Sequence, residues 1–221
     1  MSTSTGTVTP LPVRLDIAGI VLNGDLSLPG DAHGLIVFAH GSGSSRHSSR
    51  NRSVADVLQH ARLGTLLLDL LTEDEERLDV TTAEFRFDIP LLGERVVAAL
   101  DWVQAHPHTQ SLPVGLFGAS TGAAAALIAA AQRPLIVRAV VSRGGRPDLA
   151  DSSLDAVRAP TRLIVGGRDD VVIELNKQAY ARLGTPKDLQ IVPGATHLFE
   201  EPGALEQVSS LAKEWFERHL S

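Results

Sequence analysis

Apolar side chains along this chain follow two alternating patterns. Short, continuous apolar runs are separated by longer stretches in which apolar residues recur at three- and four-residue spacing. The short runs predict strands buried on both faces, and the longer stretches predict amphipathic helices. The predicted strands are Gly34–Ala39, Thr65–Leu70, Val114–Phe117, Arg138–Ser142, Arg162–Val165 and Leu189–Val192. The predicted helices are Arg52–Arg62, Pro90–Ala105, Thr121–Gln132, Ile173–Leu183 and Ala204–His219.

The beginning of the chain predicts an antiparallel hairpin. Val13–Ile17 and Ile20–Leu28 are rich in β-branched and apolar residues, and Ala18-Gly19 separates them. Together with the later runs, the hairpin gives eight strands, and strands that alternate with helices form a mostly parallel sheet with helices on both faces. We therefore expect an α/β fold.

The chain shows no internal repeat and no long linker. We expect a single domain over residues 1–221, with the Ser/Thr-rich residues 1–10 flexible. The connection between Gly144 and Pro160 is short and polar, so any helix there has a turn or two. We expect no large lid.

Composition narrows the function classes. The chain of 221 residues has 20 basic and 26 acidic side chains, a net charge of −6, and no cysteine. A disulfide framework, a thiolate metal site and a thiol nucleophile are therefore excluded. Three lysines give no basic stripe for a nucleic acid, and no apolar run approaches the roughly 20 residues that span a bilayer. We expect a cytoplasmic protein with no nucleic-acid or membrane partner.

The segment Gly118–Gly122 fits the G-x-S-x-G pattern of a nucleophile elbow, and it lies between a predicted strand and a predicted helix. Ser120 sits at the centre of this turn, where the flanking glycines leave room for a strained backbone. The helix that follows directs its free N–H groups toward the serine. The alternative is a Gly/Ala-rich turn that only lets a helix pack closely on the sheet.

A carboxylate and an imidazole follow later strands. Asp169 and Asp170 come after the strand Arg162–Val165, and His197 comes after Leu189–Val192. Because the carboxyl ends of parallel strands meet at one edge of a sheet, Ser120, Asp169 and His197 are predicted to form a catalytic triad. Asp170 is the alternative acid, but it is favoured as the cap of the next helix.

The segment after the strand Gly34–Ala39 is the expected second part of an oxyanion hole. Glycines 41 and 43 let the backbone turn its N–H groups toward a substrate. The Ser42 and Thr121 N–H groups are the predicted donors. His40 is expected to be structural, hydrogen-bonded to loop backbone.

These residues resemble those of the α/β-hydrolase superfamily, and within it the dienelactone hydrolase family, especially compact serine versions found alone or joined to phosphoribosyltransferase domains. The resemblance begins near Val13 and is carried by His40–Arg52, Gly118–Gly122, Ser142–Leu149, Gly166–Asp170 and Ala195–Phe199. It implies an α/β-hydrolase fold and a triad of Ser120, Asp169 and His197. For the acyl-enzyme chemistry of such a triad we expect no cofactor and no metal. Dienelactone hydrolase proper uses a cysteine where this chain has Ser120, so its lactone substrate does not carry over.

Three other sequence patterns give weaker indications of nucleotide binding, metal binding or a charged surface. Gly41–Arg46 begins like a dinucleotide fingerprint, but Arg46 would crowd the helix where a glycine belongs, and no P-loop sequence is present. His106 and His108 lack an identifiable third metal ligand. The acidic run Glu73–Glu76 predicts a solvated loop or the start of a helix.

Arginines cluster near the predicted triad. Arg46, Arg50 and Arg52 follow the oxyanion segment, while Arg143 and Arg146 follow the strand Arg138–Ser142. Because guanidinium binds carboxylate or phosphate, Arg46, Arg143 and Arg146 are candidates for binding an anionic substrate group. Surface ion pairing is the alternative.

The sequence thus predicts a serine hydrolase of carboxylic esters or related acyl compounds, acting on a small-molecule acyl substrate through an acyl-enzyme. A thioesterase or an acyl-amide hydrolase is the nearest alternative. A non-catalytic binding module on the same fold is the alternative from another class.

Overall fold

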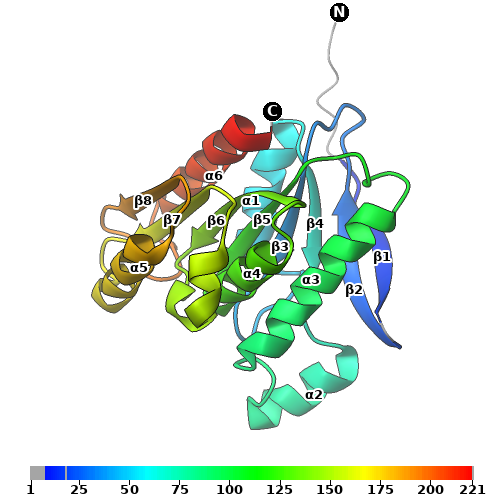
Figure 1. Cartoon of the computed structure of the whole chain (residues 1–221), viewed down its shortest axis with the longest axis horizontal. Coiled ribbons are helices and arrows are strands. Elements are labelled where there is room, and N and C mark those ends of the chain that lie inside the picture. The colour runs from blue at the N-terminus through cyan, green and yellow to red at the C-terminus, as the bar shows by residue number, and fades with distance from the viewer. Residues whose placement is uncertain (1–7, 18, 221) are drawn as a thin grey trace, which may run out of the picture.

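The computed structural model describes residues 8–17 and 19–220. Its centre is an eight-stranded sheet with the order β1-β2-β4-β3-β5-β6-β7-β8 (Figure 1). The strands are β1 (Leu11–Ile17), β2 (Ile20–Ser27), β3 (Leu35–Ala39), β4 (Gly64–Leu68), β5 (Val114–Ala119), β6 (Val137–Arg143), β7 (Thr161–Gly166) and β8 (Lys187–Val192).

The first two strands form the predicted hairpin. β1 pairs antiparallel with β2, from Leu11 opposite Leu26 to Ile17 opposite Ile20, and β2 pairs antiparallel with β4. All the other neighbouring strands are parallel. The predicted mostly parallel sheet is therefore confirmed. Ala18 of the predicted turn and most of the segment 1–10 lie outside the described residues.

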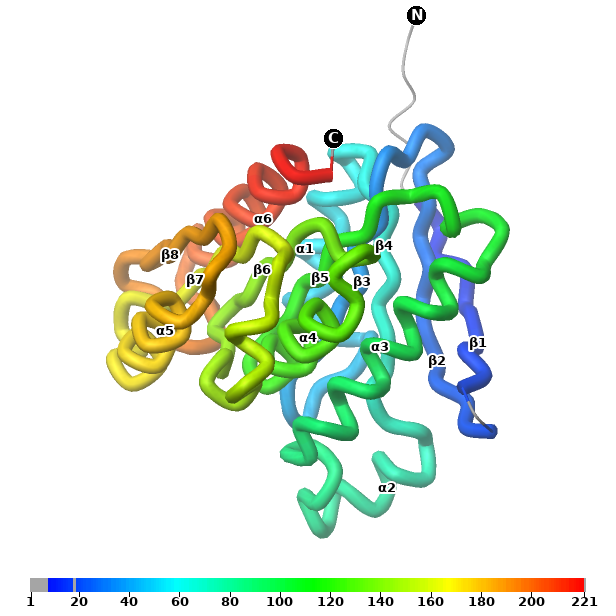
Figure 2. Tube along the Cα trace, in the orientation of Figure 1, coloured from blue at the N-terminus to red at the C-terminus, as the bar shows by residue number. Residues whose placement is uncertain are grey.

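Helices cover both faces of the sheet (Figures 1 and 2). One face is covered by α3 (Ile89–Ala105), α4 (Thr121–Gln132), the 3-10 segment η1 (Pro147–Ala156) and α5 (Asp170–Arg182). The other face is covered by α1 (Ser49–His60) and α6 (Ala204–Leu220). The helix α2 (Glu73–Thr82) projects away from the sheet, beyond the amino end of α3.

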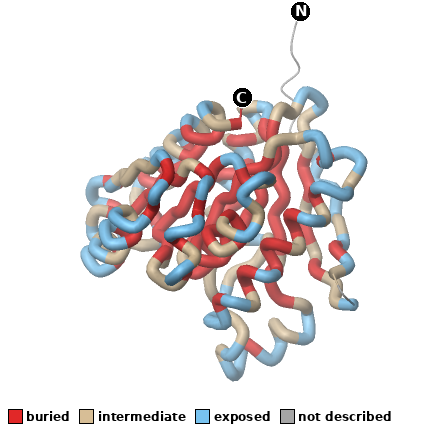
Figure 3. The backbone as a smooth tube through the Cα atoms, viewed as in Figure 1, coloured by how far each residue is buried: buried red, intermediate tan, exposed pale blue. Residues whose placement is uncertain are grey.

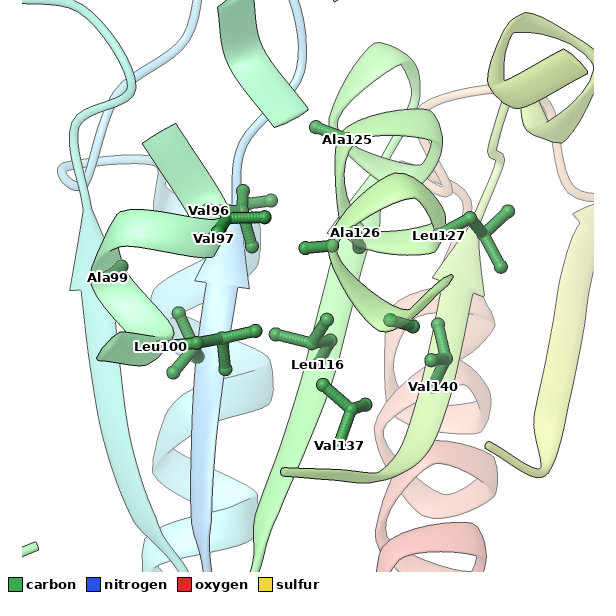
Figure 4. Close-up of a cluster of buried hydrophobic side chains, with 14 of the residues drawn as sticks. Val96, Val97, Ala99, Leu100, Leu116, Ala125, Ala126, Leu127, Val137 and Val140 are labelled. Atoms are coloured by element: carbon green, nitrogen blue, oxygen red, sulfur yellow. The ribbon is translucent and has the colours of Figure 1, made fainter. Parts of the chain in front are cut away.

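The core lies between the central strands and these two helical layers (Figure 3). In the first layer, Leu100, Leu116 and Val140 pack together with the alanines of α4 (Figure 4). The small alanine side chains bring α4 close to β3, β5 and β6. This close approach fixes the beginning of α4, where Ser120 lies.

Two helices begin about three residues earlier than predicted, and the predicted acidic run starts a helix, one of its two predicted alternatives. α1 begins at Ser49, because the side chain of Ser48 accepts a hydrogen bond from the Asn51 N–H at 3.3 Å. α5 begins at Asp170 rather than near Ile173. The acidic run after Leu71 is the start of α2, and a capping box between Thr72 and Glu75 stabilises it.

No helix within residues 8–17 and 19–220 is long and apolar enough to cross a bilayer.

The two histidines that could suggest a metal pair lie in an aromatic contact. His106 stacks on Trp102 with ring centroids 4.5 Å apart. The His106 and His108 ring centroids are 5.6 Å apart, so both histidines join an aromatic cluster at the carboxyl end of α3.

Candidate active site

Ser120 occupies a strained turn between β5 and α4. Its backbone angles are φ 51° and ψ −122°, in a region that a non-glycine residue adopts at a cost of about 1–3 kcal/mol. The neighbouring strand holds this turn in place: the Ser120 N–H donates to the Arg143 carbonyl at 3.2 Å, and the Arg146 N–H donates to the Ser120 carbonyl at 3.0 Å. The fold thus presents the Ser120 side chain at the carboxyl end of the sheet.

The glycines of the elbow are required by close packing. A Cβ at Gly118 would lie 2.4 Å from the Ala123 Cα, and one at Gly122 would lie 2.3 Å from the Ala39 carbonyl oxygen. Both neighbours are backbone atoms, which cannot move aside as a flexible side chain can. The sequence G-x-S-x-G therefore follows from the distance between α4 and the strands β3 and β5.

Replacing Gly122 with alanine should lower the free energy of unfolding by about 3 kcal/mol or more, because the added methyl overlaps backbone oxygens of β3. Urea denaturation measures this change. Gly30→Ala is the matched control, since a Cβ there meets no atom within 4 Å. Equal stability of the two variants would contradict the packing argument.

The structure brings Ser120, Asp169 and His197 together. His197 Nδ1 and Asp169 Oδ2 are 2.6 Å apart, and His197 Nε2 and Ser120 Oγ are 3.4 Å apart. A neutral imidazole protonated at Nδ1 donates to Asp169 and accepts from the Ser120 hydroxyl. This is the proton-transfer geometry of a nucleophile with its base, and a contact of 3.4 Å without substrate is at the long end of that range.

The two candidate acids have separate positions. Asp169 precedes the first residue of α5, and its side chain makes no capping hydrogen bond to the helix. Asp170 is exposed in the first turn of α5, where a carboxylate interacts favourably with the helix dipole. The carboxylate that contacts His197 is therefore that of Asp169.

Two segments that were predicted to donate to an oxyanion lie side by side. A Cβ at Gly41 would be 3.0 Å from the Ser120 Cβ, so the segment after β3 passes directly against the elbow. The hydroxyls of Ser42 and Thr121 are 2.9 Å apart, and Ser42 Oγ also donates to the Arg86 carbonyl at 3.2 Å. Thr121 is the first residue of α4, so its N–H has no acceptor within the helix. Both N–H groups remain predicted donors.

His40 has a structural position. Its Nδ1 lies 2.9 Å from the Gly41 carbonyl, and its Nε2 accepts from the Leu70 N–H at 3.0 Å. Burial lowers the pKa of this imidazole, which favours the neutral form. His40 therefore joins the segment after β3 to the segment after β4, as a structural histidine would.

A cavity of about 180 Å³ lies beside Ser120 and His197. Of the three arginines predicted to bind an anion, Arg143 lines this cavity, and Arg50 from α1 lines it as well. Arg50 belongs to the arginine cluster noted in the sequence but was not among the three predicted anion-binding residues. Leu198 forms an apolar part of the wall next to His197.

The structure does not bring Arg46 and Arg146 to this cavity. The Arg46 guanidinium forms ion pairs with Asp69 and with Asp25, the latter at 3.6 Å. The Arg46 backbone N–H also donates to the Asp69 carboxylate at 2.7 Å. Arg146 forms a two-point ion pair with Asp148 at 2.8 and 2.9 Å. Both guanidinium groups are thus occupied by nearby carboxylates, which the sequence alone did not reveal.

The sheet order and the strand-turn-helix elbow define an α/β-hydrolase fold. The model of the dienelactone hydrolase family matches residues 73–221, and this chain belongs to that family. It is similar to the crystal structure of dienelactone hydrolase from Anabaena variabilis ATCC 29413, with 56% identity and a TM-score of 0.96, covering 98% of this chain and 100% of that one. Est1E from Butyrivibrio proteoclasticus shares the fold at 17% identity and a TM-score of 0.78, over 94% and 98% of the two chains.

A curated relative from Mycobacterium tuberculosis, strain H37Rv, carries the name of a phosphoribosyl transferase. It is 59% identical over 205 residues, which are 92% of this chain and 45% of that protein. The chain thus spans less than half the length of the curated relatives that it matches. The family assignment supports a hydrolase.

Proposed function

We propose that this protein is a serine hydrolase of carboxylic esters or related acyl compounds. The observation that carries the proposal is the continuous contact from Ser120 Oγ through the His197 ring to Asp169, at a strained elbow of an α/β-hydrolase fold. Each of these three side chains has a function in acyl transfer. A binding module would not need this series of contacts.

In the proposed reaction, Ser120 Oγ attacks the carbonyl carbon while His197 Nε2 accepts its proton. Asp169 holds the tautomer in which Nδ1 carries hydrogen, and it stabilises the imidazolium that forms. The protonated His197 then donates to the leaving alcohol, which leaves an acyl-enzyme. Water activated by His197 hydrolyses that ester and restores Ser120.

The carbonyl oxygen becomes negatively charged during both attacks. The N–H groups of Ser42 and Thr121 are the proposed donors to this oxygen. The hydroxyls of these two residues are 2.9 Å apart, so the two segments lie side by side. The amino end of α4 adds its positive dipole end.

We also propose that the transferase named in the Mycobacterium tuberculosis relatives belongs to the part of those proteins that this chain does not match. The matched part has the dienelactone hydrolase family pattern. An activity screen of this chain with esters, thioesters, lactones and acyl amides assigns the preferred acyl bond. All of these bonds are open to attack by the same serine.

Labelling with a serine-directed fluorophosphonate tests the proposed nucleophile. Peptide mass spectrometry should find the label on Ser120 and on no other serine, because within residues 8–17 and 19–220 only this hydroxyl contacts an imidazole paired with a carboxylate. Ser152→Ala, a change on an exposed residue of η1, is the matched control and should label as the unmodified protein does. An unlabelled Ser120 in a folded protein would favour the binding module.

A further inference from the structure

Arg143 places a buried, unpaired positive charge beside the nucleophile. It is the last residue of β6, it is 7% exposed, and it lines the same cavity as Ser120 and His197. Its Nε and Nη1 atoms are buried without a hydrogen-bond partner in the described part of the chain. A charged group in that situation costs the folded protein free energy unless an opposite charge compensates it.

The other buried arginines show that this arrangement is unusual for the molecule. Arg95 is 8% exposed and pairs with Glu75 at 2.8 Å, and Arg162 is 4% exposed and pairs with Asp188 at 2.9 Å. Among the buried arginines of residues 8–17 and 19–220, Arg143 alone has no carboxylate partner. No carboxylate of the described residues balances Arg143, so an anionic ligand is a candidate partner.

The surroundings of Arg143 add further positive charge. Burial and the nearby charge of Arg50 lower the pKa of Arg143 to about 10, so this guanidinium is charged at neutral pH. Arg50 contacts Glu200 at 3.2 Å, but Glu200 is 63% exposed, and such a surface pair is weak. Arg143 and Arg50 therefore both contribute positive charge to the cavity, and Glu200 offsets only part of that of Arg50.

The amino end of α1 also borders this cavity. Ser48, the N-cap of α1, and Asn51, in its first turn, both line the wall beside Arg50. The free N–H groups and the dipole of a helix amino end favour bound anions, phosphate above all. Two arginines and a helix amino end together supply more positive charge than one carboxylate would balance.

We propose that Arg143, Arg50 and the amino end of α1 bind a phosphate monoester group of the substrate while Ser120 attacks an ester carbonyl of the same molecule. This inference rests on the proposed function and names its substrate class. The phosphate is a recognition group, and its own ester bond is not broken. The bond that breaks is the acyl carbon–oxygen bond: the hydroxyl of water joins the acyl carbon, and the proton goes to the leaving alcohol oxygen. The cavity of about 180 Å³ accommodates a small group, so the phosphate and the ester carbonyl must lie close together in the substrate.

Three matched acetate esters test the charge preference: 2-acetoxyethyl phosphate, 3-acetoxypropanoate and 2-methoxyethyl acetate, measured at pH 8, where the phosphate carries two charges. The expected order of kcat/KM is phosphate, then carboxylate, then neutral ester. The phosphate ester should exceed the neutral ester at least about tenfold, the value of one hydrogen bond to a charged group. Equal values for the phosphate and neutral esters, or a preference for the carboxylate, would overturn the proposal.

Variants locate the preference on Arg143. Arg143→Met should remove most of the ratio between the phosphate and neutral esters, and Arg143→Lys should restore part of it, because the charge returns without the planar fork. Arg50→Gln should lower the same ratio and covers the case in which Arg143→Met does not fold. Arg138→Met is the matched control: Arg138 is exposed near the other end of β6, and its loss changes the net charge equally. An unchanged ratio in Arg143→Met, or in Arg50→Gln if Arg143→Met does not fold, would exclude these residues as the site.

Binding to a form without the nucleophile separates this inference from the proposed function. Calorimetry of Ser120→Ala with inorganic phosphate should show binding that Arg143→Met abolishes in the same background. If no ester is hydrolysed but phosphate binds, the proposed function fails and the anion site stands. If neutral esters are hydrolysed but phosphate neither binds nor increases kcat/KM, the anion site fails and the hydrolase stands.

Discussion

Replacing Ser120 with alanine should lower kcat for a small ester by about 10⁴- to 10⁶-fold while the protein remains folded. The change removes the attacking oxygen, and in a serine triad the remaining groups give only a small residual rate. The fold should persist because alanine keeps the Cβ and the backbone hydrogen bonds of Ser120 to β6 and the following residues. Steady-state kinetics and a thermal unfolding curve measure the two effects separately.

Ser152→Ala controls for handling and for the loss of a hydroxyl, and its kcat should match that of the unmodified protein. A Ser120→Ala variant that retains more than about one hundredth of the activity would show that another group attacks the substrate.

Replacing Asp169 with asparagine should lower kcat by about 10⁴-fold, because the amide favours the wrong tautomer of His197 and no longer stabilises the imidazolium. The side chain keeps its size and its position before α5. Matched kinetics of Asp170→Asn provide the comparison. That variant should lose little activity, since Asp170 is exposed in the first turn of α5 and the Asp169 carboxylate contacts the imidazole.

A larger loss in Asp170→Asn than in Asp169→Asn would reverse the assignment of the acid. Equal, small losses in both variants would mean that His197 needs no carboxylate for its function. Circular dichroism checks that α5 keeps its helical content in each variant, because Asp170 also favours the start of this helix.

The chemistry-bearing residues could be predicted because their signals are local. Gly118 and Gly122 mark the elbow by composition, and the strand before Asp169 and the strand before His197 are marked by short apolar runs. Parallel strands then place their carboxyl ends at one edge without any knowledge of packing. The meeting of Ser120, Asp169 and His197 at one edge of the sheet follows from these few features, whereas the order of the strands does not.

The arginines could not be assigned in the same way. Arg46, Arg143 and Arg146 look alike in the sequence, and what separates them is whether a carboxylate lies within reach in space. Arg46 meets Asp69, which is 23 positions away, and Arg143 meets none within the described residues. Ion pairing over such separations depends on the twist of the sheet and the length of each loop.

Helix beginnings were also set by short-range side-chain contacts. The first turn of α1 carries polar residues, so its apolar periodicity starts only at Val54, although the Ser48 cap starts the helix at Ser49. α5 begins at Asp170 without a side-chain capping hydrogen bond, three residues before the predicted start near Ile173. Apolar spacing indicates the buried part of a helix and misses a solvated first turn.

The unpaired charge of Arg143 links the stability of this protein to its ligand. The lowered pKa of Arg143 means that the folded chain holds the charged guanidinium less favourably than the unfolded chain does, and this cost applies in full at pH values below about 10. An anion that occupies the cavity offsets the cost only in the folded state, so its binding free energy adds to the free energy of unfolding. Arg143 thereby lowers the free energy of unfolding in the absence of an anion and, under the proposed anion site, favours an anionic substrate. A buffer anion that fits the cavity would raise the free energy of unfolding and compete with that substrate.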